Sequence, residues 1–194
     1  MHIGTLTGAE LEKALEDLAR LRIEVFRDFP YLYDGTLEYE QGYLSALAGS
    51  KDCIIVAAEE GGRIVGCATG SGLAGHHAEF AAPFAAQGFD SDQVFYCGES
   101  VLLPAYRGRG LGHKFFDLRE AHAKASGYKF SAFCAVIRPE DHPLRPANYS
   151  PLDAFWQKRG YRKAPGMVTT FRWKDIGHPE ESDHPMQFWM RKLD

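Results

Sequence analysis

Apolar residues recur at intervals of three and four over the first part of the chain, which predicts two helices. The first covers residues 9–27, and Pro30 ends it. A second helix is predicted from Thr36, a residue type that caps helix N-termini, to about Ala48. Gly49 then stops this helix, because glycine readily adopts the backbone conformation that follows helix ends.

Runs of apolar, β-branched and aromatic residues predict strands in the rest of the chain. The predicted strands are residues 53–59, 63–71, 94–103, 130–137, 168–173 and 186–192. Gly61 and Gly62, between the first two strands, are typical of a tight hairpin. Residues 75–92 are irregular, although their alanine-rich part, residues 77–87, favours a helix that Pro83 weakens.

Two further helices complete the predicted order. Residues 113–126 form a helix between strands 94–103 and 130–137. A helical crossover of this kind makes the two strands that it joins parallel. A short helix over residues 152–158 is closed by Gly160.

Length and charge limit the class of protein. No repeat, low-complexity tail or linker divides the chain, so residues 1–194 are predicted to form a single domain with a sizeable core. The formal net charge of −4 disfavours a general nucleic-acid binder, which presents a basic surface. The N-terminus lacks a signal-peptide pattern, and no run approaches the ~18 apolar residues of a membrane span.

Cysteines and histidines give little sign of a metal site. The cysteines lie in apolar runs without a Cys-x-x-Cys pair: Cys53, Cys67, Cys97 and Cys134. Reduced, buried cysteines in a cytoplasmic protein are the simplest explanation. Cys134 could be a nucleophile, but no histidine pairs with it in the sequence, and a core position is favoured. Histidines without metal-ligand spacing lie in predicted loops: His76, His77, His142, His178 and His184.

The segment after strand 94–103 has the composition of a phosphate-binding turn. The strand breaks at Pro104, and a glycine loop follows as Arg107-Gly108-Arg109-Gly110-Leu111-Gly112. Glycines let backbone N–H groups face an anion, and the following helix adds its N-terminal amides and dipole. The spacing fits neither the P-loop nor the Gly-x-Gly-x-x-Gly dinucleotide fingerprint. A pyrophosphate-bearing cofactor is therefore the first hypothesis.

The loop resembles the Arg/Gln-x-x-Gly-x-Gly/Ala motif of the GCN5-related N-acetyltransferase (GNAT) superfamily, with Arg107, Gly110 and Gly112 at the matching positions. A later block, residues 152–161, resembles the family's Phe-Tyr-x-Lys-x-Gly-Phe helix and turn. Together the two resemblances cover about half of the chain. They imply a mixed α/β fold with a mostly antiparallel sheet of six to seven strands, a β-loop-α-β crossover and splayed central strands.

The resemblance also implies that the chain uses acetyl-coenzyme A as a cosubstrate, without a metal. In the family, the pantetheine arm lies between the splayed strands and bonds to the backbone of one of them. The residues implied to hold the cofactor are Val101, Leu102, Leu103, Arg107, Gly108, Arg109, Gly110, Leu111, Gly112, His113 and Trp156. A backbone N–H near Leu102 is the expected donor to the oxyanion.

Acetyl transfer to an amine favours a base, because an amine with a pKa of ~10.4 is protonated at neutral pH. Glu99 is the candidate, since it interrupts an apolar strand just before the loop. Its alternative role is structural, as a cap of the strand bulge or a partner of an arginine such as Arg138. In the family a tyrosine acts as the general acid, and Trp156 stands at the matching position in this sequence. An indole cannot reprotonate a thiolate. Tyr149 and Tyr161 are the substitutes, of which Tyr149 is better placed, and an ordinary half-buried tyrosine is the alternative for either.

The acceptor is not identified by any motif. The aromatic and acidic residues 29–34 suit a pocket for an amine with an apolar portion, or the core between two helices. Arg138 or Arg145 could bind an acceptor carboxylate, or belong to a loop held rigid by prolines.

Three functions are compatible with these patterns. The first is an N-acetyltransferase in which a small amine or peptide amine attacks the thioester directly within a ternary complex. The second is a non-catalytic acyl-coenzyme A-binding module, which Trp156 at the usual tyrosine position supports. An acetyltransferase for charged tRNA is the third, and the acidic balance disfavours it. No nucleic-acid or membrane partner is expected, and the protein is expected to be a monomer or a homodimer.

Overall fold

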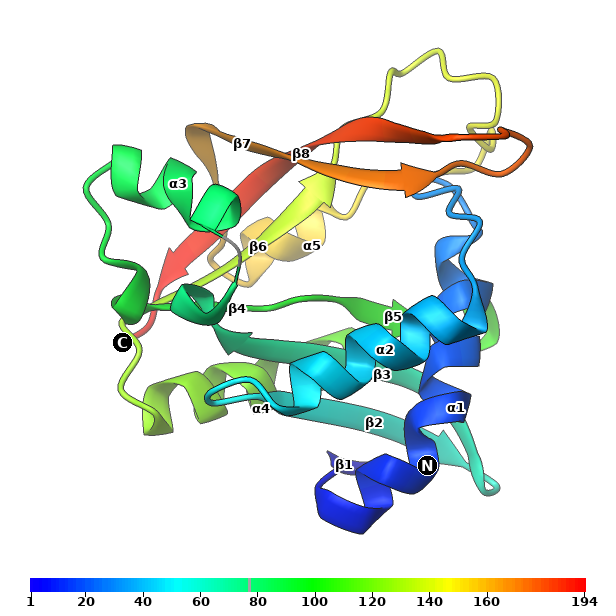
Figure 1. The fold of residues 1–194 in the computed structure, drawn as a ribbon, viewed down its shortest axis with the longest axis horizontal. Helices are drawn as coiled ribbons and strands as arrows, with labels where there is room; N and C mark the ends of the chain where they lie inside the picture. The colour runs from blue at the N-terminus through cyan, green and yellow to red at the C-terminus, as the bar shows by residue number, and fades with distance from the viewer. Residues whose placement is uncertain (77) are drawn as a thin grey trace.

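The computed structural model describes residues 1–76 and 78–194, and His77, one of the histidines considered above, lies outside them. The described part contains an eight-stranded sheet with helices on both of its faces (Figure 1). In this part of the chain no helix is long and apolar enough to cross a membrane.

The order of elements follows the predicted one closely. The helices are α1 (Gly8–Phe26), α2 (Leu37–Ala48), α3 (Ala78–Ala86), α4 (Leu111–Ala125) and α5 (Asp153–Lys158). The strands are β1 (His2–Thr5), β2 (Ile54–Glu60), β3 (Arg63–Gly72), β4 (Val94–Tyr96), β5 (Ser100–Leu102), β6 (Phe130–Val136), β7 (Arg162–Lys174) and β8 (Glu181–Lys192). The predicted helices and the first predicted hairpin are confirmed to within two residues at each end.

The strands are arranged in the order β1-β2-β3-β4-β6-β8-β7, and β5 lies beside β3 as the continuation of β4. Only β4 and β6 are parallel among the paired strands described, as the α4 crossover requires. The predicted mixed, mostly antiparallel sheet is confirmed. It has eight strands instead of six to seven, because the short β1 was not predicted and the strand predicted over residues 94–103 is divided in two.

The last two strands extend beyond their predicted bounds and include proline and glycine positions. A shift in register between Lys163 and Val168 accommodates Pro165 and Gly166 within β7. Pro185 remains within β8, where its carbonyl accepts a hydrogen bond from the N–H of Ile137 (2.9 Å). The pair therefore forms a long hairpin along one edge of the sheet.

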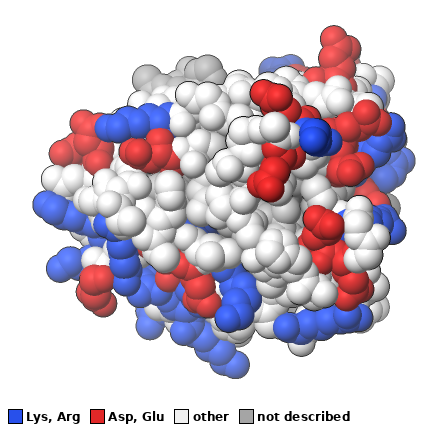
Figure 2. All heavy atoms as spheres, turned by 90° about the horizontal axis from the view of Figure 1, so that it is seen from below, with Lys and Arg blue, Asp and Glu red and all other residues white. Residues whose placement is uncertain are grey.

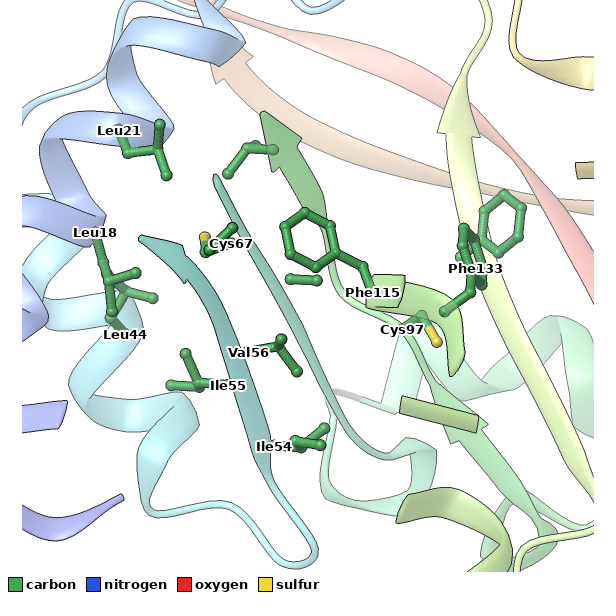
Figure 3. Packing of buried hydrophobic residues seen from close by; sticks show 14 of the residues in the cluster. Leu18, Leu21, Leu44, Ile54, Ile55, Val56, Cys67, Cys97, Phe115 and Phe133 are labelled. Atoms are coloured by element: carbon green, nitrogen blue, oxygen red, sulfur yellow. The ribbon is translucent and has the colours of Figure 1, made fainter. Parts of the chain in front are cut away.

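The main hydrophobic core lies on both faces of the sheet around β2 and β3. Figure 3 shows Leu18 of α1 and Leu44 of α2 beside Ile55 of β2, with Phe115 of α4 on the other side of β3. A Cβ at Gly66 would lie 3.0 Å from the Phe115 ring, so this glycine permits α4 to approach closely. A second core lies under α3 and includes aromatic and sulfur-containing side chains from β4, β6 and β8.

Candidate functional site

A cleft of about 1080 Å³ opens where the two halves of the sheet part. β4 and β6 pair only over Val94–Tyr96 of the first strand. Beyond this point β5 runs beside β3, while β6 continues beside β8 (Figure 1). Residues of both sides line the cleft, including Leu102 of β5 and Val136 of β6. The splayed central strands predicted above are therefore present.

A β-bulge separates β4 from β5. The carbonyl of Thr69 on β3 accepts a hydrogen bond from the N–H of Gly98 (3.0 Å), while the N–H of Thr69 donates to the carbonyl of Glu99 (3.1 Å). Two residues thus oppose one, and an extra residue bends a strand and changes the direction of its side chains. A Cβ at Gly98 would lie 2.7 Å from Thr69 Oγ1, so glycine is required there.

Arg119 of α4 stabilises this bulge through hydrogen bonds to both strands. Its guanidinium is buried and donates from Nη1 to the carbonyls of Thr69 (3.1 Å) and Glu99 (2.8 Å), and from Nη2 to Ser100 Oγ (2.7 Å). Buried carbonyls require hydrogen-bond partners, and a bulge disturbs the pairing of strand carbonyls. The helix that follows the glycine loop is therefore fastened to the point where the strands part.

The glycine loop has the backbone geometry of an anion site. Gly108 and Gly110 have φ values of +76° and +79°, in the left-handed region that favours glycine. Gly110 is the N-cap of α4, and no side chain of the described residues caps this helix end. Uncapped amides at a helix N-terminus, together with the dipole, attract an anion. The sequence prediction of a phosphate-binding turn therefore has a matching geometry.

Gly112 brings the two recognised sequence blocks together. A Cβ at this position would lie 3.3 Å from Cζ of Phe155 on α5. The Phe155 ring also lies 4.8 Å from the His113 ring, centroid to centroid. The second glycine of the motif thus allows α5 to pack against the start of α4.

Most of the predicted cofactor residues line the cleft, and three do not. The lining residues among them are Leu102, Arg107, Gly108, Gly110, Leu111, Gly112, His113 and Trp156. Val101 and Leu103 are buried, and the N–H of Leu103 donates to the carbonyl of Val65 on β3 (3.0 Å). Arg109 lies outside the lining, with its guanidinium 5.0 Å from the centre of the Tyr106 ring. The main chain of Leu103 is therefore paired with β3, and the side chain of Arg109 lies outside the cleft lining.

Alternation along β5 explains the difference between Leu102 and its neighbours. In an antiparallel pair, successive residues direct their N–H and C=O groups to opposite sides. Because Leu103 bonds to β3, the main chain of Leu102 turns the other way, and its carbonyl accepts a hydrogen bond from Arg107 Nε (3.1 Å). The N–H of Leu102 therefore lies on the side of the opening.

The Glu99 side chain lies in the cleft floor within a buried ion network. Its Oε1 pairs with Arg22 Nη1, and Arg22 Nε also bonds to Glu40 Oε2. The Tyr43 hydroxyl donates to Glu99 Oε2 (3.2 Å). All three charged side chains are buried: Arg22 is 8% exposed, Glu40 is 1% exposed and Glu99 is 6% exposed. The network therefore contains two carboxylates and one guanidinium.

Electrostatics hold Arg22 and Tyr43 in single protonation states. Burial lowers the pKa of Arg22. The charges of Glu99, Tyr43 and Glu40 together raise it by more, so the pKa of Arg22 lies above its usual value. Burial and the charge of Glu99 raise the pKa of Tyr43, although Arg22 opposes this. At neutral pH Arg22 is a cation and Tyr43 is a hydrogen-bond donor.

Glu99 is paired with an arginine, as its structural alternative expects, but this arginine is Arg22 and not Arg138. Arg138 instead forms a two-point ion pair with Asp175 and also donates to the backbone carbonyls of Pro30 and Tyr31. Its donors are therefore engaged within the protein, which leaves Arg145 as the arginine in this part of the cleft lining that could meet an acceptor.

Tyr149 stands in the cleft wall with other aromatic side chains. Its ring meets Phe29 edge-on, at 4.7 Å between centroids, and the Arg145 guanidinium lies 5.1 Å from its centre. Burial raises the pKa of Tyr149, the charge of Arg145 lowers it, and Asp153 raises it. The net rise means that the phenol keeps its proton at neutral pH.

Trp156 and Cys134 also line the cleft. Trp156 packs against Phe133 and Trp189, with ring centroids at 5.0 and 5.1 Å. Burial raises the pKa of the Cys134 thiol to about 12, although a hydrogen bond with the Tyr96 hydroxyl (3.0 Å) opposes the rise. A neutral thiol is a poor nucleophile, so the core interpretation of Cys134 is favoured. Within residues 1–76 and 78–194, no cluster of histidine, cysteine or carboxylate side chains could hold a metal ion.

Three charged residues of the site were not identified from the sequence. Each lies four residues from a buried apolar residue of its own helix: Arg22 after Leu18, Glu40 before Leu44 and Arg119 after Phe115. A charge at a core-facing position of an amphipathic helix is the signal that could have found them.

The surface charge gives no comparable guide to the site. On the face in Figure 2, acidic and basic side chains both occur, separated by broad uncharged areas. The cleft, with its loop and its buried ion network, is therefore the candidate site.

Comparisons with known proteins agree with this geometry. Three solved structures have a similar fold: an aminoglycoside 6'-N-acetyltransferase complexed with coenzyme A (TM-score 0.64, 12% identity, 100% of this chain and 98% of that chain), a ribosomal-protein-alanine N-acetyltransferase from Brucella melitensis (0.64, 14%, 100% and 100%), and an aminoglycoside 6'-N-acetyltransferase from Enterococcus faecium (0.63, 11%, 100% and 98%). No curated protein sequence matches the chain. A model of the acetyltransferase (GNAT) family matches residues 15–147, more than half of the chain. The chain therefore belongs to the acetyltransferase (GNAT) family.

Proposed function

We propose that the protein is an acetyl-coenzyme A-dependent N-acetyltransferase that acetylates a primary amine by direct attack in a ternary complex. The observation that carries this proposal is that the glycine loop and Glu99 line the same cleft. The similar structures are named for aminoglycosides and for a ribosomal protein. These names support N-acetyl transfer and leave the acceptor open.

The residues at the loop fit the proposed cosubstrate. Bound acetyl-coenzyme A supplies an acetyl group activated as a thioester. Backbone N–H groups of residues 108–112 and the Arg107 side chain would bind its diphosphate, because they combine an uncapped helix N-terminus with a positive charge. Leu102 would hold the arm through its main chain, in the opening between β5 and β6.

Glu99 would take the proton of the attacking amine. Two carboxylates face one guanidinium in its network, so uptake of one proton leaves Arg22 paired with Glu40. Before proton uptake the three side chains carry a net charge of −1, and afterwards Arg22 and Glu40 form a neutral pair. Arg22 is therefore not left as an unpaired buried cation, which would be unfavourable. Tyr149, whose phenol stays protonated at neutral pH, would donate a hydrogen bond to the leaving thiolate.

A thiol-release assay separates this proposal from a non-catalytic acyl-coenzyme A-binding module. The protein is incubated with acetyl-coenzyme A and a panel of primary amines, while free thiol and acetylated product are both measured. Release of thiol in equal amount to acetylated amine supports transfer. Binding of acetyl-coenzyme A without any acetylated product would favour the binding module.

Glu99→Gln is expected to lower kcat on the order of 100-fold, the lower range for loss of a general base, with little change in acetyl-coenzyme A affinity. Glutamine keeps the size of the side chain and its hydrogen-bonding oxygen, so the fold is retained. Raising the pH should restore part of the rate, because more of the free amine is then unprotonated. Glu140→Gln is the matched control, since Glu140 is an exposed carboxylate in the same cleft lining. An equal rate in both variants would exclude Glu99 as the base.

A further inference from the structure

One buried arginine joins three segments at the wall of the cleft. Arg138 follows β6 and donates from Nε to the carbonyl of Pro30 (2.8 Å) and from Nη2 to the carbonyl of Tyr31 (2.7 Å), both in the α1–α2 connection. It also pairs with Asp175, which follows β7, through Nη1 (2.9 Å) and Nη2 (2.8 Å). We call Pro30, Tyr31, Arg138 and Asp175 the bracket. Two-point arginine–carboxylate pairs have a defined geometry, and this one is shielded, with side chains 9% and 13% exposed.

Main-chain pairing extends the bracket along the outer edge of β7. Residues 32–34 lie beside residues 174–176 like a short additional strand. The contacts are Asp34 N–H to the Lys174 carbonyl (2.8 Å), Ile176 N–H to the Leu32 carbonyl (2.7 Å) and an antiparallel bridge between Tyr33 and Asp175. Because β7 is the last strand of the sheet, this part of its free edge is occupied by the chain itself.

This pairing affects the kind of acceptor that can enter. Extended peptides are commonly bound by addition to an exposed strand edge, where main-chain hydrogen bonds give affinity. Here residues 32–34 already pair with the chain at the end of β7, and Pro30, Tyr31 and Arg138 form part of the cleft lining. A peptide strand added at this position would have to displace residues 32–34, and Arg138 holds the residues just before them through the carbonyls of Pro30 and Tyr31.

The chemistry of the cleft wall near Glu99 suits a cation. The rings of Phe29, Tyr31 and Tyr149 and the carboxylate of Glu99 face the same cleft. Burial raises the pKa of Tyr31, Glu99 adds to the rise and Arg22 opposes it, so this phenol keeps its proton at neutral pH. Aromatic faces and a carboxylate favour an ammonium group attached to an apolar portion.

We propose that the acceptor is a compact primary amine with an apolar or aromatic portion, and that the bracket excludes the same amine when it is part of a polypeptide. The proposal rests on the acetyl transfer proposed above.

Matched acceptors test the proposal. 2-Phenylethylamine and 1,5-diaminopentane are compared with two ten-residue peptides, one with a free N-terminal phenylalanine and one with an internal lysine. The compact amines should have a kcat/KM at least about 100-fold higher, equivalent to about 2.7 kcal/mol of transition-state stabilisation. Peptides acetylated as efficiently as the amines would overturn the inference and leave acetyl transfer intact. Binding of acetyl-coenzyme A without acetylation of any acceptor would reject the proposed function itself.

Loosening the bracket should change this selectivity. Asp175→Asn and Arg138→Lys are each expected to raise the ratio of peptide to amine kcat/KM at least about tenfold, because the wall opens more easily. Two variants are used so that a folding defect in one leaves the other. Arg172→Gln is the matched control, since Arg172 lies on the same hairpin in an exposed pair with Glu181, with side chains 65% and 60% exposed. A ratio that stays unchanged in a folded bracket variant would contradict the selective role.

Discussion

Replacing Gly110 by aspartate is expected to weaken acetyl-coenzyme A binding on the order of 100-fold, by isothermal titration. A carboxylate at the N-cap of α4 would stand beside the proposed diphosphate. Two unit charges about 5 Å apart repel by about 3 kcal/mol at the effective dielectric of a protein surface. Dissolved salt weakens this repulsion. The diphosphate carries a second negative charge, which strengthens the repulsion by a similar amount. The loss should therefore shrink as ionic strength rises.

Gly110→Asn is the matched control for this prediction. Gly110 has a φ of +79°, a conformation that asparagine and aspartate both tolerate better than other residues do. A Cβ at this position would meet no atom within 4 Å, so neither substitution causes a clash. The asparagine variant should bind within about tenfold of the natural protein, because it lacks the charge. Similar affinity in both variants would show that the loop does not hold the diphosphate.

Arg22→Met is expected to lower the free energy of unfolding by about 3–5 kcal/mol in urea denaturation, the usual loss when one member of a buried ion pair is removed. Methionine fills much of the same volume but leaves Glu40 and Glu99 buried without their shared cation. These carboxylates are 1% and 6% exposed, so water cannot replace the guanidinium. The ring of Tyr43, which lies 4.4 Å from the guanidinium, also loses a cation–π contact.

Arg20→Met on the same helix provides the control for the stability measurement. Arg20 pairs with Glu16 four residues earlier, and both side chains are more than half exposed. Exposed pairs of this kind contribute about 0.3–0.5 kcal/mol. A loss in Arg22→Met no larger than that in Arg20→Met would contradict the stabilising role assigned to the buried network.

The local features of the fold were predictable from the sequence, because short-range patterns determine them. Periodic apolar residues predicted α1 and α2, and the glycines at positions 61 and 62 predicted the first hairpin. The glycine loop was predicted from composition and confirmed as a turn with positive φ values before a helix. The parallel pairing of β4 and β6 followed from the crossover between them.

Long-range contacts were not predictable, and they determine much of the site. Whether Val101 or Leu102 faces the opening depends on the register with β3, which a one-residue bulge changes. The partner of Glu99 is Arg22, 77 positions earlier in the chain, and no local pattern connects the two. Similarly, the ion pair between Arg138 and Asp175 depends on the tertiary arrangement of segments far apart in the sequence, which no local pattern predicts.

A crystal structure of the protein with bound coenzyme A tests the central claim most directly. The account predicts that diphosphate oxygens accept hydrogen bonds from main-chain N–H groups of residues 108–112 at about 2.7–3.2 Å, with the arm lying between β5 and β6. A diphosphate bound elsewhere on the protein, with the opening between these strands empty, would contradict it.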